Sequence, residues 1–259
     1  MKNLFKYIGI SAVLLFSFYY TEKMSNIVIN NSALVMKINE QTSEYNSLPV
    51  SATIDGKYIT PGLNGSSVNV IKSYNNMKFL DTFNSYYLVF DKTLPDVSLE
   101  NNKDKIIKNG NINKNSVAII IKDNIDIINY SKEKNVFITR LINYNSYDKN
   151  AYYEQINNDM ENFKKVESML NNNNINKNIC VINNNNFNIC KKNNMYLVEP
   201  TITLTNYNLG SIKEKIKSGY IININDDVSL SDYKILLRQI YYQDLSVISL
   251  SKLISEERD

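Results

Sequence analysis

The pattern of hydrophobic and polar residues divides the chain into three stretches of different periodicity. An apolar run over 7–20 follows a start that carries Lys2 and Lys6. Between 50 and 90, short alternating segments are separated by turn residues, which is typical of β-strands. From 117 onwards, short apolar runs alternate with segments of helical period, which is typical of an α/β domain. The pattern therefore predicts an N-terminal hydrophobic segment, a small β-rich module and an α/β domain.

The N-terminal segment, 1–23, reads as a signal anchor. Its apolar run is about 14 residues long, which is short for a spanning helix but sufficient for the apolar region of a signal sequence. The run ends in Tyr19 and Tyr20, where a cleavage site requires small residues and a membrane interface favours aromatic rings. We expect a single-pass membrane protein with its C-terminal domain outside the cytoplasm. A cleaved signal peptide and a buried core helix are the alternatives.

Residues 24–110 are expected to form a connecting stalk and a small β-rich module. The stalk, 25–46, is mixed in pattern and is expected to contain some strand. Asp55 and Gly56 separate two short alternating segments, which predicts a β-hairpin. A further strand is expected over 86–90. The polar stretch 101–115 contains Gly110 and marks the predicted domain boundary.

Residues 111–259 are expected to form the α/β domain. The continuous apolar run 117–121 predicts a strand buried on both faces. Apolar residues near helical spacing predict an amphipathic helix over 151–170. Repeated βα units imply a parallel sheet, open or closed into a barrel. The other expected strands are 136–142, 179–182, 195–198, 220–224 and 246–250, and the other expected helices are 125–134, 187–192, 212–217 and 231–242.

The composition narrows the chemistry. The 259 residues include 43 asparagines but no histidine and no tryptophan, and the formal net charge is +3. Asn, Ile, Lys and Tyr all have AT-rich codons, so a biased genome explains the asparagine content. The charge is too small and too scattered for a nucleic-acid-binding surface. Glycine is too rare for a loop that cradles phosphates, so no nucleotide cofactor is expected.

Polar residues follow two of the expected strands at positions that matter for function. Lys122 and Asp123 end the first, in VAIIIKDN, and Asn225 and Asp226 end a late one, in GYIININD. The segment of roughly 115–255 resembles the NodB-homology domain of polysaccharide deacetylases in the order of its elements and in short stretches of sequence. That domain is a distorted (β/α) barrel. The upstream segments IDGKYITPGLNG and KSYNNMK resemble the N-terminal region of envelope-anchored deacetylases from low-GC bacteria.

The resemblance implies a catalytic site whose motifs have degenerated. The family's T-F-D-D-G motif supplies a base and a metal ligand, and here these positions hold Lys122 and Asp123. The histidine of its L-H-D motif is replaced by Asn225, while the aspartate remains as Asp226. The region of the H-x-x-x-H motif, 143–153, contains no histidine, and the R-P-P-Y-G wall, near 180–186, is unrecognisable.

This site is expected to be inactive. A hydrolytic zinc site needs about three protein ligands, usually including imidazole, and an open position for water. A protonated Lys122 cannot act as a base unless it is strongly desolvated. We therefore expect a pseudo-deacetylase with no metal and no cofactor.

Two other readings stay open. Two suitably spaced carboxylates after strand ends could catalyse glycoside hydrolysis or hold a hard cation. The candidates are Asp123, Asp126, Asp226 and Asp227, which could equally be loop and helix-capping residues. The protein could also be a purely structural surface protein.

Two cysteines and two runs of asparagine are further features that could matter for the structure or for binding. Cys180 and Cys190 are the only cysteines, and in an oxidising compartment either a disulfide or two separate thiols would fit. The asparagine runs 171–174 and 183–186 are expected to form polar loops, on which a glycan-binding face is conceivable. The expected function is binding of a cell-wall glycan or an envelope protein, without catalysis.

Overall fold

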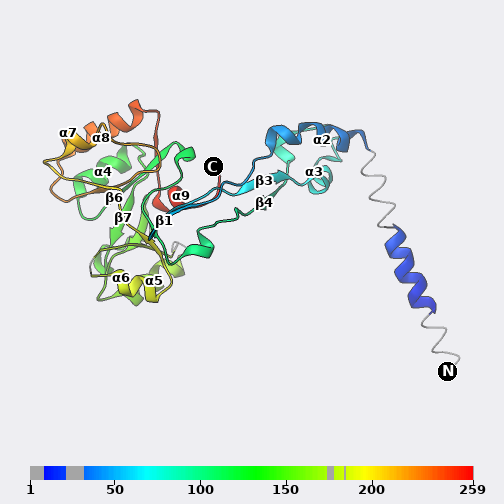
Figure 1. The fold of residues 1–259 in the computed structure, drawn as a ribbon, viewed down its shortest axis with the longest axis horizontal. Helices are drawn as coiled ribbons and strands as arrows, with labels where there is room; N and C mark the ends of the chain where they lie inside the picture. The colour runs from blue at the N-terminus through cyan, green and yellow to red at the C-terminus, as the bar shows by residue number, and fades with distance from the viewer. Residues whose placement is uncertain (1–8, 22–31, 174–177, 184, 259) are drawn as a thin grey trace, which may run out of the picture. The chain divides into compact units, whose positions relative to one another are not determined.

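The computed structural model describes residues 9–21, 32–173, 178–183 and 185–258 (Figure 1). The chain forms two compact units. The first, the N-terminal unit, comprises Met1–Leu48 and Gly65–Thr93. The second, the C-terminal unit, comprises Pro49–Asn64 and Leu94–Asp259.

The predicted anchor is described only in part. Residues 9–21 are helical, and their large apolar side chains are exposed. The rest of the predicted segment, 1–8 and 22–23, lies outside the described residues. In the part of the chain that the structure describes, no helix is long and apolar enough to cross a membrane.

The N-terminal unit packs two helices beside a two-stranded sheet. Helix α2 (Ala33–Tyr45) occupies the region predicted to be a stalk with some strand. That prediction was wrong because Ser32 caps the helix by accepting a hydrogen bond from the backbone of Val35, and α2 buries one face. Leu34 and Ile38 of α2 pack with Met77 of the next helix. That helix is α3 (Val70–Met77), which packs beside β3 (Gly65–Val68) and β4 (Phe90–Thr93) in the same unit.

The strand predicted over 86–90 begins later than expected. A short 3₁₀ helix, η1 (Ser85–Tyr87), precedes β4. The side chain of Asn84 accepts a hydrogen bond from the backbone of Tyr86 at 3.0 Å, and this local bond competes with an extended conformation.

In the C-terminal unit, one sheet has the strand order β1-β2-β5-β10-β9. The predicted hairpin is confirmed: Asp55 pairs with Tyr58, and Gly56 has a φ of 57°. These strands are β1 (Thr53–Asp55), β2 (Tyr58–Thr60), β5 (Ile106–Ile107), β10 (Tyr196–Val198) and β9 (Ile179–Val181).

This sheet also places the domain boundary differently from the predicted position at residue 110. Strand β2 pairs with β5, and β5 pairs with β10 of the α/β region. The residues before 110 that form β1, β2 and β5 therefore belong to the C-terminal unit. The boundary was not visible in the sequence because pairing partners such as Ile106 and Leu197 are far apart along the chain.

The second sheet has the order β11-β12-β6-β7-β8, and β13 also pairs with β6. Every pair in it is parallel. Its strands are β11 (Ile202–Leu204), β12 (Ile221–Ile224), β6 (Ser116–Ile121), β7 (Thr139–Ile142), β8 (Glu154–Asn157) and β13 (Ser246–Ile248). Strand β11 was not predicted.

Strand β6 is buried on both faces, as predicted. Val117, Ile119 and Ile121 pack in a core that includes residues of the helices α4 (Ile125–Glu133) and α8 (Leu230–Tyr242). Ala118 and Ile120 point to the other face, into a core shared with strands of the first sheet. The two sheets thus enclose a common core, and no hydrogen-bonded ladder joins them among the described strands. This arrangement is a distorted, open barrel.

Helices flank the sheets (Figure 1), and the last of them packs in the core that the two sheets share. The prediction of one long helix over 151–170 was wrong. Gln155 to Asn157 are buried in β8 and pair with β7, so this part of the segment is extended and not helical. The helices are α4 (Ile125–Glu133), α5 (Phe163–Asn172), α6 (Phe187–Lys192), α7 (Leu209–Ile212), α8 (Leu230–Tyr242) and α9 (Leu250–Ile254).

Candidate functional site

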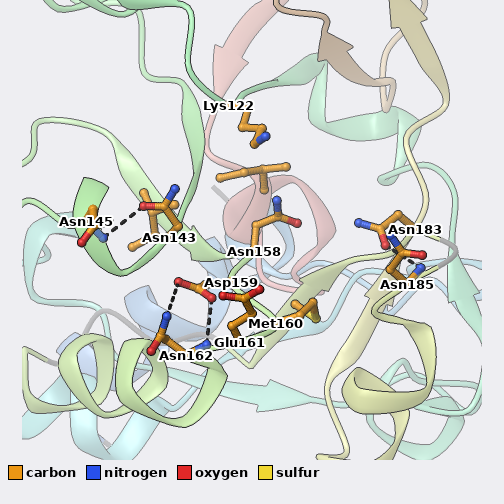
Figure 2. A pocket seen from close by; sticks show the side chains of 12 residues that line it. Lys122, Asn143, Asn145, Asn158, Asp159, Met160, Glu161, Asn162, Asn183 and Asn185 are labelled. Atoms are coloured by element: carbon orange, nitrogen blue, oxygen red, sulfur yellow. Dashed lines mark hydrogen bonds between the residues drawn. The ribbon is translucent and has the colours of Figure 1, made fainter.

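A cavity of about 460 Å³ lies where β6, β7, β8 and β9 end (Figure 2). The carboxyl ends of parallel strands are where (β/α) barrels build their sites, because the loops there converge. The lining is dominated by polar side chains. Its residues are Lys122, Leu141, Ile142, Asn143, Asn145, Asn158, Asp159, Met160, Glu161, Asn162, Asn183 and Asn185.

Local hydrogen bonds shape the loops after β7 and β8. Asn143 caps the short helix η4 (Tyr144–Ser146) by accepting hydrogen bonds from the backbone of Asn145 and Ser146, each at 3.0 Å. The Asp159 carboxylate accepts a hydrogen bond from the backbone of Tyr144 at 2.9 Å and another from Asn162 at 2.8 Å. The backbone N–H of Asn162 is the main cause that lowers the pKa of Asp159, followed by that of Tyr144. Asp159 therefore ties the two loops together as a carboxylate.

The loop after β9 is held by a buried asparagine. The Asn186 side chain donates to the carbonyl of Val181 at 2.8 Å and accepts from the backbone of Asn183 at 2.7 Å. This bonding fixes Asn183 and Asn186, the two ends of the run that the sequence predicts to be a polar loop; residue 184 lies outside the described residues. Two of its members, Asn183 and Asn185, line the cavity opposite Asn143 and Asn145, as Figure 2 shows.

The four degenerate motif positions are brought together only in part. Lys122 lines the cavity, and its Nζ lies 3.7 Å from Oδ2 of Asp123. The backbone N–H of Asp123 lies 3.4 Å from Oδ1 of Asp226. Asn225 is exposed and is not among the lining residues. The positions that the resemblance assigns to base and metal ligand are therefore neighbours, while the asparagine in the place of histidine stands apart from the cavity.

Arg140 is a site residue that the sequence reasoning missed. Its guanidinium lies 3.9 Å from Oδ1 of Asp123, donates to the carbonyl of Lys122 at 3.2 Å and donates to the hydroxyl of Tyr153 at 2.9 Å. The side chain is only 14% exposed. A single arginine within the apolar strand 136–142 was the signal that could have pointed to it, since a charge there needs a partner.

These residues do not fit the zinc ion that the deacetylase fold implies. Two cations, Lys122 and Arg140, lie beside Asp123, which is the position of the expected metal ligand. Within the described residues, no group of three histidine, cysteine, aspartate or glutamate side chains could hold a metal ion. A divalent cation would be repelled by both side chains and would find too few ligands for a zinc site.

The remaining carboxylate candidates do not form a catalytic pair at this cavity. Asp126 and Asp227 are exposed and do not line it. Asp126 lies in the first turn of α4, which is capped by Asn124, and Asp227 precedes α8, which is capped by Ser229, so neither aspartate is an N-cap. The cavity instead offers amide groups, one ammonium and two carboxylates, which suits recognition of a polar ligand.

Cys180 and Cys190 form a disulfide, with Cα atoms 6.1 Å apart. It links β9 to α6 below the loop that carries the cavity asparagines. Both cysteines are buried beside Phe163 and Met195. The bond therefore braces one wall of the cavity from the core side.

Comparison with known proteins supports the fold. No family model matches the chain. An uncharacterised protein of Bacillus subtilis, YlxY, is 32% identical over 96 residues, which is 37% of this chain and 30% of YlxY. The chain thus spans under a third of that curated relative.

Solved structures cover far more of the chain. The wild-type BA3943 protein of Bacillus anthracis, a family 4 carbohydrate esterase (CE4) pseudoenzyme, matches with a TM-score of 0.58 and 21% identity over 87% of this chain and 96% of its own. A BA3943 mutant with restored enzymatic activity matches with a TM-score of 0.57 and 22% identity, over 87% of this chain and 99% of its own. The resemblance to polysaccharide deacetylases is confirmed at the level of fold: the chain has the fold of a CE4 pseudoenzyme.

Proposed function

We propose that this protein is a catalytically inactive relative of the polysaccharide deacetylases that binds envelope glycan in the cavity at the end of β6 to β9. The observation that supports this proposal most directly is that Lys122 and Arg140 both lie beside Asp123. The fold supplies a groove of the right kind, while these two cations stand where a metal would have to bind. The polar lining supports recognition of hydroxyl groups through the amides of its asparagines.

The first test is chemical. The purified full-length protein, mixed with N-acetylglucosamine oligomers and Zn²⁺, Co²⁺ or Mn²⁺, is expected to release acetate no faster than buffer. The reason is that Asp123, which lies beside two cations and outside any group of three metal-ligating side chains among the described residues, does not hold a metal that could activate water. Acetate is measured enzymatically, with an active deacetylase as the positive control. Metal-dependent release that disappears in the Asp123→Asn variant would refute inactivity.

The second test concerns binding. Asn158 projects into the cavity from the loop after β8 (Figure 2). Asn158→Ala is expected to weaken binding of peptidoglycan or chitin oligomers by about threefold to tenfold, the loss of about one hydrogen bond. Isothermal titration calorimetry gives the affinity. The matched control is Asn113→Ala, an exposed position just before β6, at the opposite end of the strand. Equal losses in both variants, or no binding by the unaltered protein, would contradict the proposal.

We further propose that the segment 1–23 anchors the protein in the cell membrane, with the C-terminal unit outside the cytoplasm. The support is its sequence pattern: the basic start, the apolar run, and Tyr19 and Tyr20 at its end. Intact cells treated with external protease are expected to lose the full-length band, while a cytoplasmic marker survives. A band that resists protease until the cells are lysed would contradict this topology.

A further inference from the structure

Among the charged groups of the cavity, the lysine has an ion-pair partner and the two carboxylates have none within the described residues. Lys122 has Asp123 at 3.7 Å, and Asp123 is not part of the lining. Asp159 and Glu161 line the cavity, and neither forms an ion pair within the described part of the chain. The cavity therefore contains two carboxylates without a counter-charge and one cation that already has a counter-charge.

Asp159 is prepared to stay charged. Its carboxylate accepts the backbone N–H groups of Tyr144 and Asn162 and the side-chain amide of Asn162, at 2.9, 2.8 and 3.3 Å. These bonds lower the pKa of Asp159, so its side chain stays ionised at pH values where an ordinary aspartate would begin to take up a proton. The backbone N–H of Glu161 adds to this lowering of the pKa, and Asp159 lines the cavity with its negative charge kept.

The asparagines around these carboxylates suit a sugar. Asn158 projects from the same loop as Asp159 and Glu161, while Asn143 and Asn183 stand on opposite sides (Figure 2). Their amides both donate and accept, as hydroxyl groups of a sugar ring require. The few apolar side chains of the lining, such as Met160, offer little surface for an acetyl methyl group.

Building on the proposed glycan-binding function, we propose that this cavity selects amino sugars whose nitrogen carries no acetyl group and is therefore an ammonium. The ammonium supplies three donors and a positive charge to Asp159 and Glu161, whereas an acetylated nitrogen supplies one donor and no charge. Lys122 disfavours the same charge at its own end of the cavity, which orients the sugar. The ligand class is thus a de-N-acetylated glycan strand.

The experiment compares two probes, the glucosamine pentamer and the N-acetylglucosamine pentamer, on the full-length protein by calorimetry, at a pH where the free amine is protonated. The glucosamine pentamer is expected to bind about tenfold more tightly or better, with a preference that shrinks as salt is added. In the Asp159→Asn/Glu161→Gln double variant, the preference is expected to vanish, because the affinity for the glucosamine pentamer falls to that of the same variant for the acetylated probe. The matched control is Glu214→Gln, an exposed acid that is not a lining residue.

Each outcome bears on a different claim. Equal affinity for both probes overturns the selectivity and leaves glycan binding intact, while failure of both probes to bind overturns the proposed function itself. A preference that survives in the double variant, or equally tight binding of pentalysine, overturns the assignment to this cavity. Because Asp159 also ties two loops together, the exposed Glu161→Gln single variant is measured beside the double variant. The Glu161→Gln protein is expected to keep its melting temperature and to lose part of its preference for the glucosamine pentamer. A folded Glu161→Gln protein with an unchanged preference would contradict the proposal.

Discussion

Replacement of Gly219 by alanine is expected to lower the free energy of unfolding by about 2–5 kcal/mol. Gly219 has a φ of +86°, a conformation that costs a residue with a Cβ about 1–2 kcal/mol. An added Cβ would also lie 2.5 Å from the carbonyl oxygen of Gly110, and overpacking of this kind costs about 1–3 kcal/mol. The backbone there cannot retreat easily, because Gly110 donates to the carbonyl of Gly219 at 2.7 Å and Gly219 donates to that of Ser116 at 2.8 Å.

Urea unfolding of the full-length protein measures this effect, and Gly210→Ala provides the matched control. Gly210 lies in helix α7, and a Cβ built on it has no neighbour within 4 Å. Alanine favours a helix over glycine by about 1 kcal/mol, so this variant is expected to be as stable as the original protein or slightly more so. A Gly219→Ala protein that unfolds at the same urea concentration as the Gly210→Ala protein would show that the close approach of Gly110 carries no cost.

Removal of the disulfide is the second large effect. The Cys180→Ala/Cys190→Ala variant is expected to lose about 3 kcal/mol of stability, because the bond closes a loop of about 11 residues in the unfolded chain. Alanine is the appropriate replacement, since both positions are buried in an apolar cluster where a hydroxyl would lack a partner. The loss is measured as a shift in the urea midpoint.

Reductant supplies the control for this prediction. It is expected to destabilise the unaltered protein and to leave the double-alanine variant unchanged. If reductant shifts the urea midpoint of both proteins equally, the loss of stability is not caused by reduction of this disulfide. Because the bond lies below the loop 183–186, the same variant is also expected to bind glycan more weakly through a less ordered cavity wall.

The proposed function accounts for two features of the site, the charges around Asp123 and the polar cavity. Arg140 and Lys122 supply positive charge beside Asp123, so the carboxylate is compensated without an ion. The loops beyond it retain a polar cavity whose ionised Asp159 and amides suit recognition of a ligand.

Much of the α/β half was predictable because its signals are local. The run 117–121 predicted β6 and its burial on both faces, and the helix over 187–192 was predicted with its observed bounds. The hairpin at Asp55–Gly56 was equally clear. Where local signals conflicted, the prediction was wrong: the apolar residues of 151–170 fit a helical period, yet 154–157 form a strand because β7 offers it a partner.

By itself, the sequence determined the alternation of strands and helices, the absence of histidine and the identities at 122, 123, 225 and 226, because each depends on residue type or near neighbours. Only the tertiary structure decided that β2 and β5 join the C-terminal unit and that Arg140 meets Asp123. It also gathered Asn143, Asp159 and Asn183 around one cavity. The physical reason is that parallel strands bring their carboxyl ends together whatever their separation along the chain. A site built from several loops therefore cannot be recognised in any one segment of the sequence.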